Sequence, residues 1–256
     1  MNNDRIIRLE RIRNCRDIGM LAGKDGRTVR SGRLLRSAAP VSPSVKDLAD
    51  LKDRYRLAKV IDLRTDGEKG ENPDVLPDGT VYIHNPVFAD MHAGVTHEEE
   101  TRRNHSLPDM RILYRMMMTR KDCLANLSKA AQTIMTHDYG TGSVLWHCTE
   151  GKDRCGLVSM IIEMALGMDR DTVREDYLMT NLVNRARAEA YYRQTLVSTG
   201  REEMAAAVRD LFLAKEEYLD AALEAVDSYG SDEAFLTEGL QIPEEVIKNF
   251  RDSMLE

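Results

Sequence analysis

The alternation of apolar and polar positions in the first 150 residues predicts short buried strands separated by helices. Short apolar runs occur at 33–36, 59–63, 80–84 and 143–147, and the last of them follows the turn-forming sequence Gly140-Thr141-Gly142. Between the first two runs, residues 45–55 place apolar side chains at helical spacing. Strands that alternate with helices indicate an α/β fold with a largely parallel central sheet flanked by helices.

The later part of the chain follows a helical pattern. Residues 108–138 are predicted to be helical with a break near Arg120, and a helix at 154–166 is apolar on nearly every side and should be buried. Beyond residue 169 the candidate helices are 178–196, 202–214, 216–229 and 244–254. Residues 85–110 show little periodicity, and we predict a lid or insertion over 85–118. We expect 1–256 to form a single domain, with a helical C-terminal part, 169–256, packed on the core.

Composition narrows the class of protein. Apolar residues make up 42% of the 256 residues, which is typical of a globular protein with a substantial core. No apolar run approaches the roughly 18 residues of a membrane span, so we expect no stable membrane insertion. The charged N-terminus lacks the apolar stretch of a signal peptide, which makes the cytoplasm the expected location.

The four cysteines, Cys15, Cys123, Cys148 and Cys155, form no CxxC pair, which is typical of reduced thiols. No His/Cys cluster has the spacing of zinc ligands, so we expect no metal and no other cofactor.

The net charge of -7 is unevenly distributed. Residues 1–36 contain ten Lys/Arg against four Asp/Glu, and residues 200–256 contain five against fifteen. The basic part could attract anionic ligands, whereas the acidic tail argues against a nucleic-acid partner. Alternatively, both are solvated faces. The sequence leaves the oligomeric state open.

One segment places reactive residues where a strand, a loop and a helix meet. The strand at 143–147 leads into the sequence HCTEGKDRCG, residues 147–156, and the buried helix follows. This geometry aims backbone N–H groups and the positive end of the helix at one point, which creates an anion site. Gly151 and Gly156 allow the backbone to curl closely around a phosphate.

A cysteine at the start of such a loop lies in a positive potential, so we expect Cys148 to be a thiolate at neutral pH. A thiolate can attack phosphorus and form a phosphocysteine intermediate, which water then hydrolyses. Arg154 follows six residues later, and its planar fork can hold two phosphate oxygens and stabilise the transition state. The alternative is that Cys148 is an inert buried thiol and Arg154 a surface residue at the helix start.

These residues resemble a known family. HCTEGKDRCG is similar to the HCxxGKDR loop of the bacterial atypical protein-tyrosine and lipid phosphatases, a branch of the cysteine-dependent tyrosine phosphatase superfamily. Residues 14–19 (NCRDIG), 31–37 (SGRLLRS), 62–64 (DLR) and 218–240 also resemble segments of that family, and 85–135 are the least similar. The resemblance implies a tyrosine-phosphatase-like fold and protein-tyrosine phosphatase activity.

The resemblance also implies a general acid. In the family, the aspartate directly before the arginine is the proposed acid, which points to Asp153. The only tryptophan is Trp146, so the Trp-Pro-Asp loop of typical tyrosine phosphatases is absent. Asp153 is alternatively an ordinary helix N-cap, and Asp90 and Asp109 are then the reserve candidates.

Further roles surround the nucleophile. The resemblance implies that His147 hydrogen-bonds the loop backbone and that the turn containing Asp17 braces the loop. Arg64 ends a strand at the same edge of the sheet, where it either lines the mouth of the site or pairs with Asp62 or Asp66.

The remaining loop residues, Thr149, Glu150, Gly151 and Lys152, are expected to bind the substrate. Lys152 could neutralise a second phosphate, or it could be a solvated lysine. Glu150 is unfavourable for a polyanionic lipid, and this departure from the family pattern weakens the lipid hypothesis.

Cys155 stands where related loops place Ser or Thr, whose hydroxyl hydrogen-bonds the thiolate. A thiol is a weaker donor, but it could trap an oxidised Cys148 as a disulfide. Alternatively, Cys155 only fills a small buried space.

The sequence therefore predicts a cysteine-dependent phosphatase that hydrolyses phosphomonoesters, most directly phosphotyrosine. Phosphoserine, phosphothreonine and phosphoinositide activities remain open, as do substrates that are phosphorylated proteins or small molecules. The alternatives are a phosphate-binding pseudophosphatase and a rhodanese-like sulfurtransferase.

Overall fold

The computed structural model describes residues 3–88 and 109–256, and their centre is a five-stranded sheet. The strand order is β1-β2-β5-β3-β4, in which β2, β5, β3 and β4 are parallel and β1 pairs antiparallel with β2. The strands are β1 (Arg16–Asp17), β2 (Leu34–Ala38), β3 (Leu57–Asp62), β4 (Val81–His84) and β5 (Ser143–Cys148). The predicted α/β class with a largely parallel sheet is confirmed.

Both faces of the inner strands are buried, which explains their nearly continuous apolar sequences. Successive side chains of a strand point to opposite faces, so neighbours along the chain enter different apolar clusters. The larger cluster receives Leu34, Ile61 and Trp146, and the smaller one receives Leu35, Val60 and Leu145. Each cluster is then closed by a different set of elements.

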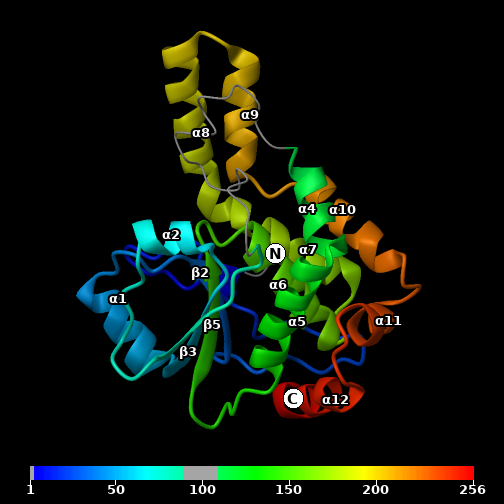
Figure 1. Cartoon of the computed structure of the whole chain (residues 1–256). Coiled ribbons are helices and arrows are strands. Elements are labelled where there is room, and N and C mark those ends of the chain that lie inside the picture. Colours follow the sequence, from blue (N-terminus) through cyan, green and yellow to red (C-terminus); the bar gives the residue numbers. More distant parts are fainter. Residues whose placement is uncertain (1–2, 89–108) are drawn as a thin grey trace.

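Helices from residue 110 onward cover the larger cluster, and they lie together on one side of the sheet in Figure 1. They are α4 (Met110–Thr119), α5 (Lys121–Met135), α6 (Asp153–Ala165), α7 (Arg170–Leu178), α10 (Glu216–Asp227), the π-helical η3 (Phe235–Gly239) and α12 (Glu244–Met254). The short helix α11 (Asp232–Ala234) precedes η3 and has no buried residue. All residues of α6 are buried, as its apolar sequence predicts. The smaller cluster is closed by the π-helical η2 (Asp50–Arg54) and by Ile7 and Ile12 of the N-terminal segment.

Two long helices, α8 (Thr180–Thr199) and α9 (Glu202–Phe212), form a hairpin that projects from the rest of the molecule (Figure 1). Gly200 ends α8 with a positive φ of 66°, a conformation that glycine adopts without strain. The base of the hairpin is tied by side chains of α8, since Asn184 Nδ2 donates to Phe212 O at 3.1 Å and Asn181 Nδ2 to Ala214 O at 2.8 Å.

The register of the sheet determines what surrounds the end of β5. Ala38 of β2 lies opposite Cys148, and Asp62 of β3 lies opposite His147. The carboxyl ends of three parallel strands therefore meet at one edge, which is where open α/β sheets bind ligands.

Some elements differ from the prediction. The strand β1 and the helix α2 (Asp66–Glu71) were not predicted, because each is short and polar. The helix expected over 45–55 is α1 (Val45–Ala49) followed by η2, and Val45 is 87% exposed rather than buried. Of the predicted lid at 85–118, residues 89–108 lie outside the described residues, and 110–118 belong to α4. The η1 turn (Asn3–Arg5) begins the described chain.

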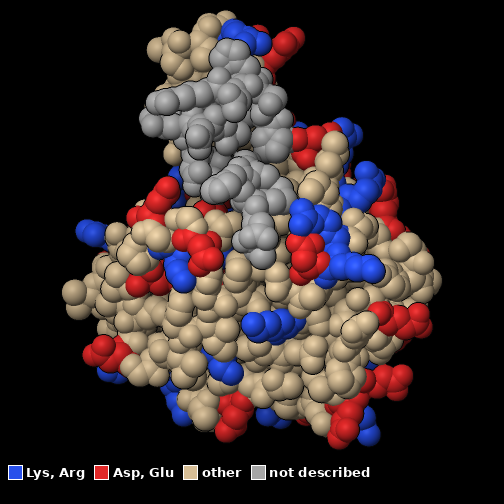
Figure 2. All heavy atoms as spheres, in the orientation of Figure 1, with Lys and Arg blue, Asp and Glu red and all other residues tan. Residues whose placement is uncertain are grey.

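Charged residues of both signs are interspersed on the face shown in Figure 2. No broad single-sign field covers that face, so it gives no support to a long-range attraction of anions. Within the described ranges, no helix is both long and apolar enough to cross a membrane.

Candidate active site

The backbone conformation of the loop between β5 and α6 depends on a glycine at position 151. Cys148 is the last residue of β5, and Asp153 is the first residue of α6. Gly151 adopts a φ of 66°, and a Cβ at this position would lie 2.5 Å from the backbone carbonyl of Ser37. No other residue fits without moving β2, so Gly151 is required for the close packing of the loop on this strand, and the predicted curl around a phosphate stays a prediction.

The thiol of Cys148 is buried but is easily ionised. The neighbouring Cys155 and the positive charge of Arg154 outweigh the effect of burial, and together they lower the pKa of Cys148 to about 6. Burial and the neighbouring Cys148 raise the pKa of Cys155 well above its ordinary value, so Cys155 stays a protonated donor. At neutral pH the pair is thus a thiolate beside a thiol.

Arg154 is held in place by a carboxylate from another element. Its Nη1 and Nη2 atoms lie 2.6 and 2.7 Å from the Oε2 and Oε1 atoms of Glu68, and both side chains are buried. The hydroxyl of Thr149 also donates to Glu68. The Nε atom of Arg154 is buried and makes no hydrogen bond with the described residues. A buried donor of this kind fits an anion, because leaving it unpaired is costly.

Glu68 is a site residue that sequence reasoning missed. Burial would raise its pKa, but the hydrogen bonds from Arg154 lower the pKa of Glu68 to about 2, so the carboxylate is ionised. It lies in α2, where Thr65 and Glu68 form a reciprocal capping box. The sequence Thr65-Asp-Gly-Glu68 carries the signature of such a box, and this signal could have predicted α2.

Asp153 has two partners at the mouth of the loop. Its Oδ1 accepts a hydrogen bond from the Tyr114 hydroxyl at 2.7 Å and lies 3.3 Å from Nζ of Lys152. The N-cap of α6 is Lys152, and it makes no side-chain capping bond. The alternative that Asp153 is an ordinary N-cap is therefore wrong.

Of the two reserve acids, one is paired with an arginine and the other lies outside the described residues. Asp109 is the N-cap of α4, where it accepts a hydrogen bond from the Arg111 backbone at 2.9 Å. A further hydrogen bond from the Arg111 side chain lowers the pKa of Asp109, which makes it a poor proton donor. Asp90 lies outside the described residues.

The ring of His147 is fully buried between two carboxylates. Its Nε2 lies 2.8 Å from Asp74 Oδ2, and its Nδ1 lies 3.8 Å from Asp62 Oδ1. Arg64 pairs with both of these aspartates at 2.8 Å, so it has the expected partner Asp62 but Asp74 rather than Asp66. The three acceptor groups could surround a metal ion, but the guanidinium of Arg64 already compensates both carboxylates.

The turn before β1 contacts the loop through Asn14 rather than Asp17. Asn14 Nδ2 donates to the carbonyls of Glu150 and Gly151 at 3.1 and 3.0 Å. The Asp17 carboxylate instead accepts from the Gly19 and Gly32 backbones, and among the described residues it makes no hydrogen bond with the loop.

Two loop side chains point toward the helical hairpin. The ammonium group of Lys152, which is 1% exposed, donates to Leu211 O at 2.6 Å and to Leu213 O at 3.2 Å. Glu150 lies 2.6 Å from Arg187 of α8, and burial raises its pKa to about 7. Lys152 is therefore not a solvated lysine, and its ammonium group is hydrogen-bonded to carbonyls at the end of α9.

Two cavities differ in their position relative to the loop. One of about 440 Å³ adjoins the loop, and its lining includes Thr149, Glu150 and Arg64, so Arg64 both lines this cavity and pairs with Asp62.

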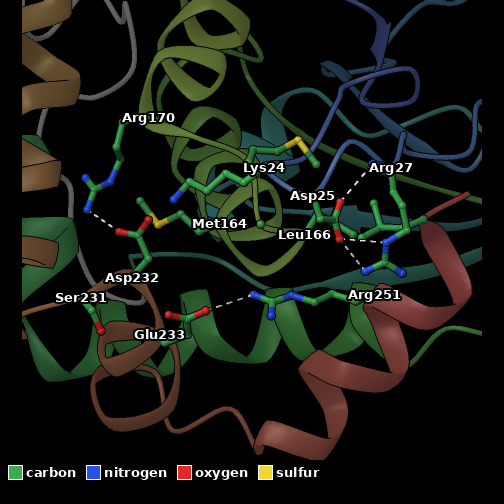
Figure 3. Close-up of a pocket in the computed structure, with 13 residues that line it drawn as sticks. Lys24, Asp25, Arg27, Met164, Leu166, Arg170, Ser231, Asp232, Glu233 and Arg251 are labelled. Carbon is green, nitrogen blue, oxygen red and sulfur yellow. Dashed lines mark hydrogen bonds and ion pairs between the residues drawn. The ribbon is translucent and has the colours of Figure 1, made fainter.

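The other cavity, of about 530 Å³, lies at the far end of α6 (Figure 3). Its lining holds neither cysteine nor histidine, and Arg170 and Arg251 pair there with Asp232 and Glu233. The larger cavity is thus not where the nucleophile lies.

Comparison with known proteins agrees with the geometry. Residues 7–256 match the model of the tyrosine phosphatase family. A protein of Cupriavidus necator provisionally named a tyrosine-protein phosphatase is 31% identical over 234 residues, which cover 90% of this chain and 82% of that protein. The triple specificity protein phosphatase PtpB of Mycobacterium tuberculosis is 29% identical over 79% of this chain and 84% of its own. The solved catalytic core of Siw14 is 13% identical, covers 87% of this chain and 96% of its own, and has a TM-score of 0.34, too low to bear on function.

Proposed function

Because the chain belongs to the tyrosine phosphatase family, we propose that Cys148 is the nucleophile through which it hydrolyses phosphomonoesters. The enzyme is a cysteine-dependent phosphatase that acts on phosphorylated substrates. The observation that carries the assignment of the nucleophile is a buried cysteine with a pKa of about 6 on the same loop as a buried arginine. In the first step the Cys148 thiolate attacks phosphorus, and the leaving alcohol or phenol departs from a phosphocysteine intermediate. Water then hydrolyses this intermediate and releases phosphate.

Arg154 stabilises the charge of the transferring phosphoryl group. Its Nε is the free donor, and Glu68 fixes the plane of the fork from the opposite end. A planar guanidinium held in one orientation loses little entropy when it binds an anion, so its contribution is greatest in the transition state. Glu68 is in this view a positioning residue for Arg154.

Asp153 donates the proton to the leaving group. Its carboxyl lies at the start of α6, next to the loop, and Tyr114 holds one of its oxygens. An acid fixed by one hydrogen bond can present its second oxygen to a leaving group within hydrogen-bond reach. Asp109 supports no such role, because it is paired with Arg111.

The substrate class that the family supports is phosphotyrosine-type. The triple specificity named for PtpB makes phosphoserine, phosphothreonine and a third class reasonable arms of a substrate panel. A polyanionic phosphoinositide is disfavoured, since the ammonium of Lys152 is engaged by two carbonyls and Glu150 adds a carboxylate to the loop. No observation favours the pseudophosphatase or the sulfurtransferase.

The test compares Cys148→Ser and Arg154→Lys with the parent on phosphotyrosine peptides, phosphoserine peptides and phosphoinositides. Cys148→Ser is expected to abolish turnover and still bind orthovanadate, because the backbone of the loop remains. Arg154→Lys keeps the charge but loses the fork, so kcat should fall by about a hundredfold or more. Appreciable turnover in Cys148→Ser would exclude the covalent mechanism, and a change in KM alone would limit Arg154 to binding the ground state.

A further inference from the structure

Three arginines converge on one aspartate in the interior behind the catalytic loop. Asp176 of α7 accepts hydrogen bonds from Arg5 at 2.7 Å, from Arg36 at 2.9 Å and from Arg16 at 3.2 Å. All four side chains are at least 95% buried. Buried ions at this density need a specific reason, because desolvating them costs several kcal/mol each.

The cluster reaches the catalytic loop by two routes. Arg36 spans from Asp176 to the loop, since its Nη2 donates to Gly151 O at 3.1 Å. Arg16 donates through Nη1 to Asn14 Oδ1 at 2.7 Å. This bond fixes which end of the Asn14 amide faces the loop, so that its NH₂ group donates to the loop carbonyls as described above.

Both routes end on loop carbonyls, and this determines where the loop N–H groups point. In a trans peptide unit the C=O and N–H bonds point to opposite sides. The carbonyls of Glu150 and Gly151 are drawn outward by Asn14 and Arg36, so the N–H groups of Gly151 and Lys152 are turned the other way. Those N–H groups are the donors that a phosphate-binding loop presents to its anion.

We propose that Asp176 is a positioning residue for the catalytic loop: it holds Arg36 and Arg16 so that the loop carbonyls face outward and the N–H groups face the phosphate. This inference rests on the proposed function of the loop. Without the Asp176 carboxylate, the three arginines lose the acceptor that they share, so the hydrogen bonds of Arg36 to Gly151 and of Arg16 to Asn14 are no longer held in place.

Asp176 is suited to a constant structural charge. Burial works to raise its pKa, but Arg16, Arg36 and Arg5 hold the pKa of Asp176 well below its ordinary value. It is ionised at any pH at which the thiolate of Cys148 exists, so it sets geometry rather than titrating during turnover.

The adjacent residue of α7 contacts the other side of the site. The Tyr177 hydroxyl lies 2.8 Å from that of Tyr114, the residue that holds Asp153, and a Cβ at Gly156 would lie only 3.1 Å from the Tyr177 ring. Consecutive residues of one helix therefore support both the anion-binding loop and the proposed acid.

The experiment measures the inhibition constant of orthovanadate and the pH dependence of Cys148 alkylation in Asp176→Asn, with Asp171→Asn as the control. Asp171 is an exposed carboxylate on the same helix, so its neutralisation should change neither quantity. In Asp176→Asn, orthovanadate should bind at least about tenfold more weakly, and the Cys148 titration should move to higher pH, because misdirected N–H groups stabilise anions poorly. If Asp176 acted only as a charge, its removal would either leave excess positive charge, with the opposite sign in both measurements, or be compensated by ionisation of the buried Glu163, with no change in either measurement; both results would overturn the proposal.

A second variant keeps the test decisive if Asp176→Asn does not fold. Arg36→Lys retains the positive charge but cannot span Asp176 and Gly151 with a fork, so it should also weaken orthovanadate binding. If both single variants fold, the double variant should bind orthovanadate within about twofold as tightly as the single variant with the lower affinity, because both substitutions disrupt the same route. Parental orthovanadate affinity in folded Arg36→Lys, or fully additive losses, would refute the role of Asp176. Turnover by Cys148→Ser would instead refute the proposed function and leave these anion-binding results interpretable.

Discussion

Around Cys148, the ionisable side chains divide into those fixed in one charge state and those whose proton can move. Hydrogen bonds from arginines overcome burial and hold the pKa values of Glu68 and Asp62 at about 2. The pKa of Cys148, at about 6, lies where a change of pH alters the thiolate population. Fixed charges thus surround a thiol that can gain or lose its proton near neutral pH.

We predict that Asp153→Asn selectively slows substrates with poor leaving groups. An alkoxide needs a proton as it departs, whereas an activated phenolate does not, so kcat on phosphoserine peptides should fall by about a hundredfold or more, with a much smaller loss on an activated aryl phosphate. Asp109→Asn serves as the control and should leave both rates unchanged, because Asp109 is paired with Arg111. Equal losses on both substrates would remove Asp153 from the acid role, and a selective loss in Asp90→Asn would transfer that role.

We predict that Cys155 captures oxidised Cys148. A peroxide oxidises the Cys148 thiolate to a sulfenic acid and is itself reduced to water; the Cys155 sulfur then attacks, a disulfide forms, and a second water molecule leaves. Cys155 acts directly on the pKa of Cys148, so the two side chains are neighbours, and the Cys155 sulfur itself lies 3.6 Å from Ser37 O and 3.7 Å from Trp146 O. Mass spectrometry of peroxide-treated protein should find a linked Cys148–Cys155 peptide, and a dithiol should restore activity. If Cys155→Ser recovers from peroxide as fully as the parent, Cys155 only fills space.

The loop could be predicted from sequence because its chemistry is contiguous, whereas its partners could not. Cys148, Arg154 and Gly151 lie within seven residues, and their spacing alone implies an anion site. Glu68, by contrast, comes from a separate helix, and only the tertiary fold brings its carboxylate to Arg154. The bracing residue was assigned to the correct turn but to Asp17 rather than Asn14, since the sequence does not reveal which side chain faces the loop.

At the scale of elements, helices and strands with a strong apolar periodicity were placed well by the sequence, and those with a weak periodicity were not. β5 and α6 form almost where the sequence indicated, and the break near Arg120 separates α4 from α5. β1 and α2 are too short for a period to be visible, and α2 depends on its capping box rather than on an apolar face. The projection of α8 and α9 also escaped prediction, because a helical pattern does not specify which neighbour a helix packs against.

We predict that Lys152 connects the catalytic loop to the helical hairpin. Lys152→Met removes a buried ammonium that donates to Leu211 O and Leu213 O, so the free energy of unfolding should fall by about 2 kcal/mol, and hydrogen exchange should rise at the end of α9. Lys215→Met, which loses a partly exposed ion pair with Asp210, is the matched control and should cost less than about 1 kcal/mol. Equal losses in urea unfolding, with no change in exchange at the end of α9, would contradict this link.

At the scale of the whole molecule, the basic excess of the N-terminal segment is partly internal. Arg5, Arg16 and Arg36, three of the ten basic residues in 1–36, are buried around Asp176. A count of charges along the sequence therefore overstates the positive field at the surface. The larger apolar cluster contains residues from Ile18 to Leu255, which supports one domain over 1–256, although the domain boundaries stay a prediction.

The stability of the whole molecule should decrease in acid, with a sign fixed by its buried carboxylates. The pKa of Glu68 is about 2 in the folded protein and 4.5 in its ordinary state, so the unfolded chain binds the proton first as pH falls. The stability that Glu68 contributes is complete above about pH 4.5 and is lost as pH falls toward 2, and Asp62 behaves alike from its ordinary 3.8. Protonation of each of these two carboxylates should lower the free energy of unfolding by about 2 to 3 kcal/mol over this pH range.

Urea unfolding between pH 7 and pH 3 tests this prediction with Glu68→Gln. The variant should be less stable than the parent at pH 7, and the difference should shrink as pH falls, because the unfolded parent takes up a proton on Glu68 below about pH 4.5 whereas glutamine has no proton to bind. Glu71→Gln, an exposed carboxylate on the same helix, should follow the parent at every pH. If the difference in stability between Glu68→Gln and the parent stays constant down to pH 3, Glu68 stabilises the fold through packing and neutral hydrogen bonds. Its ion pair with Arg154 would then contribute nothing to the pH dependence.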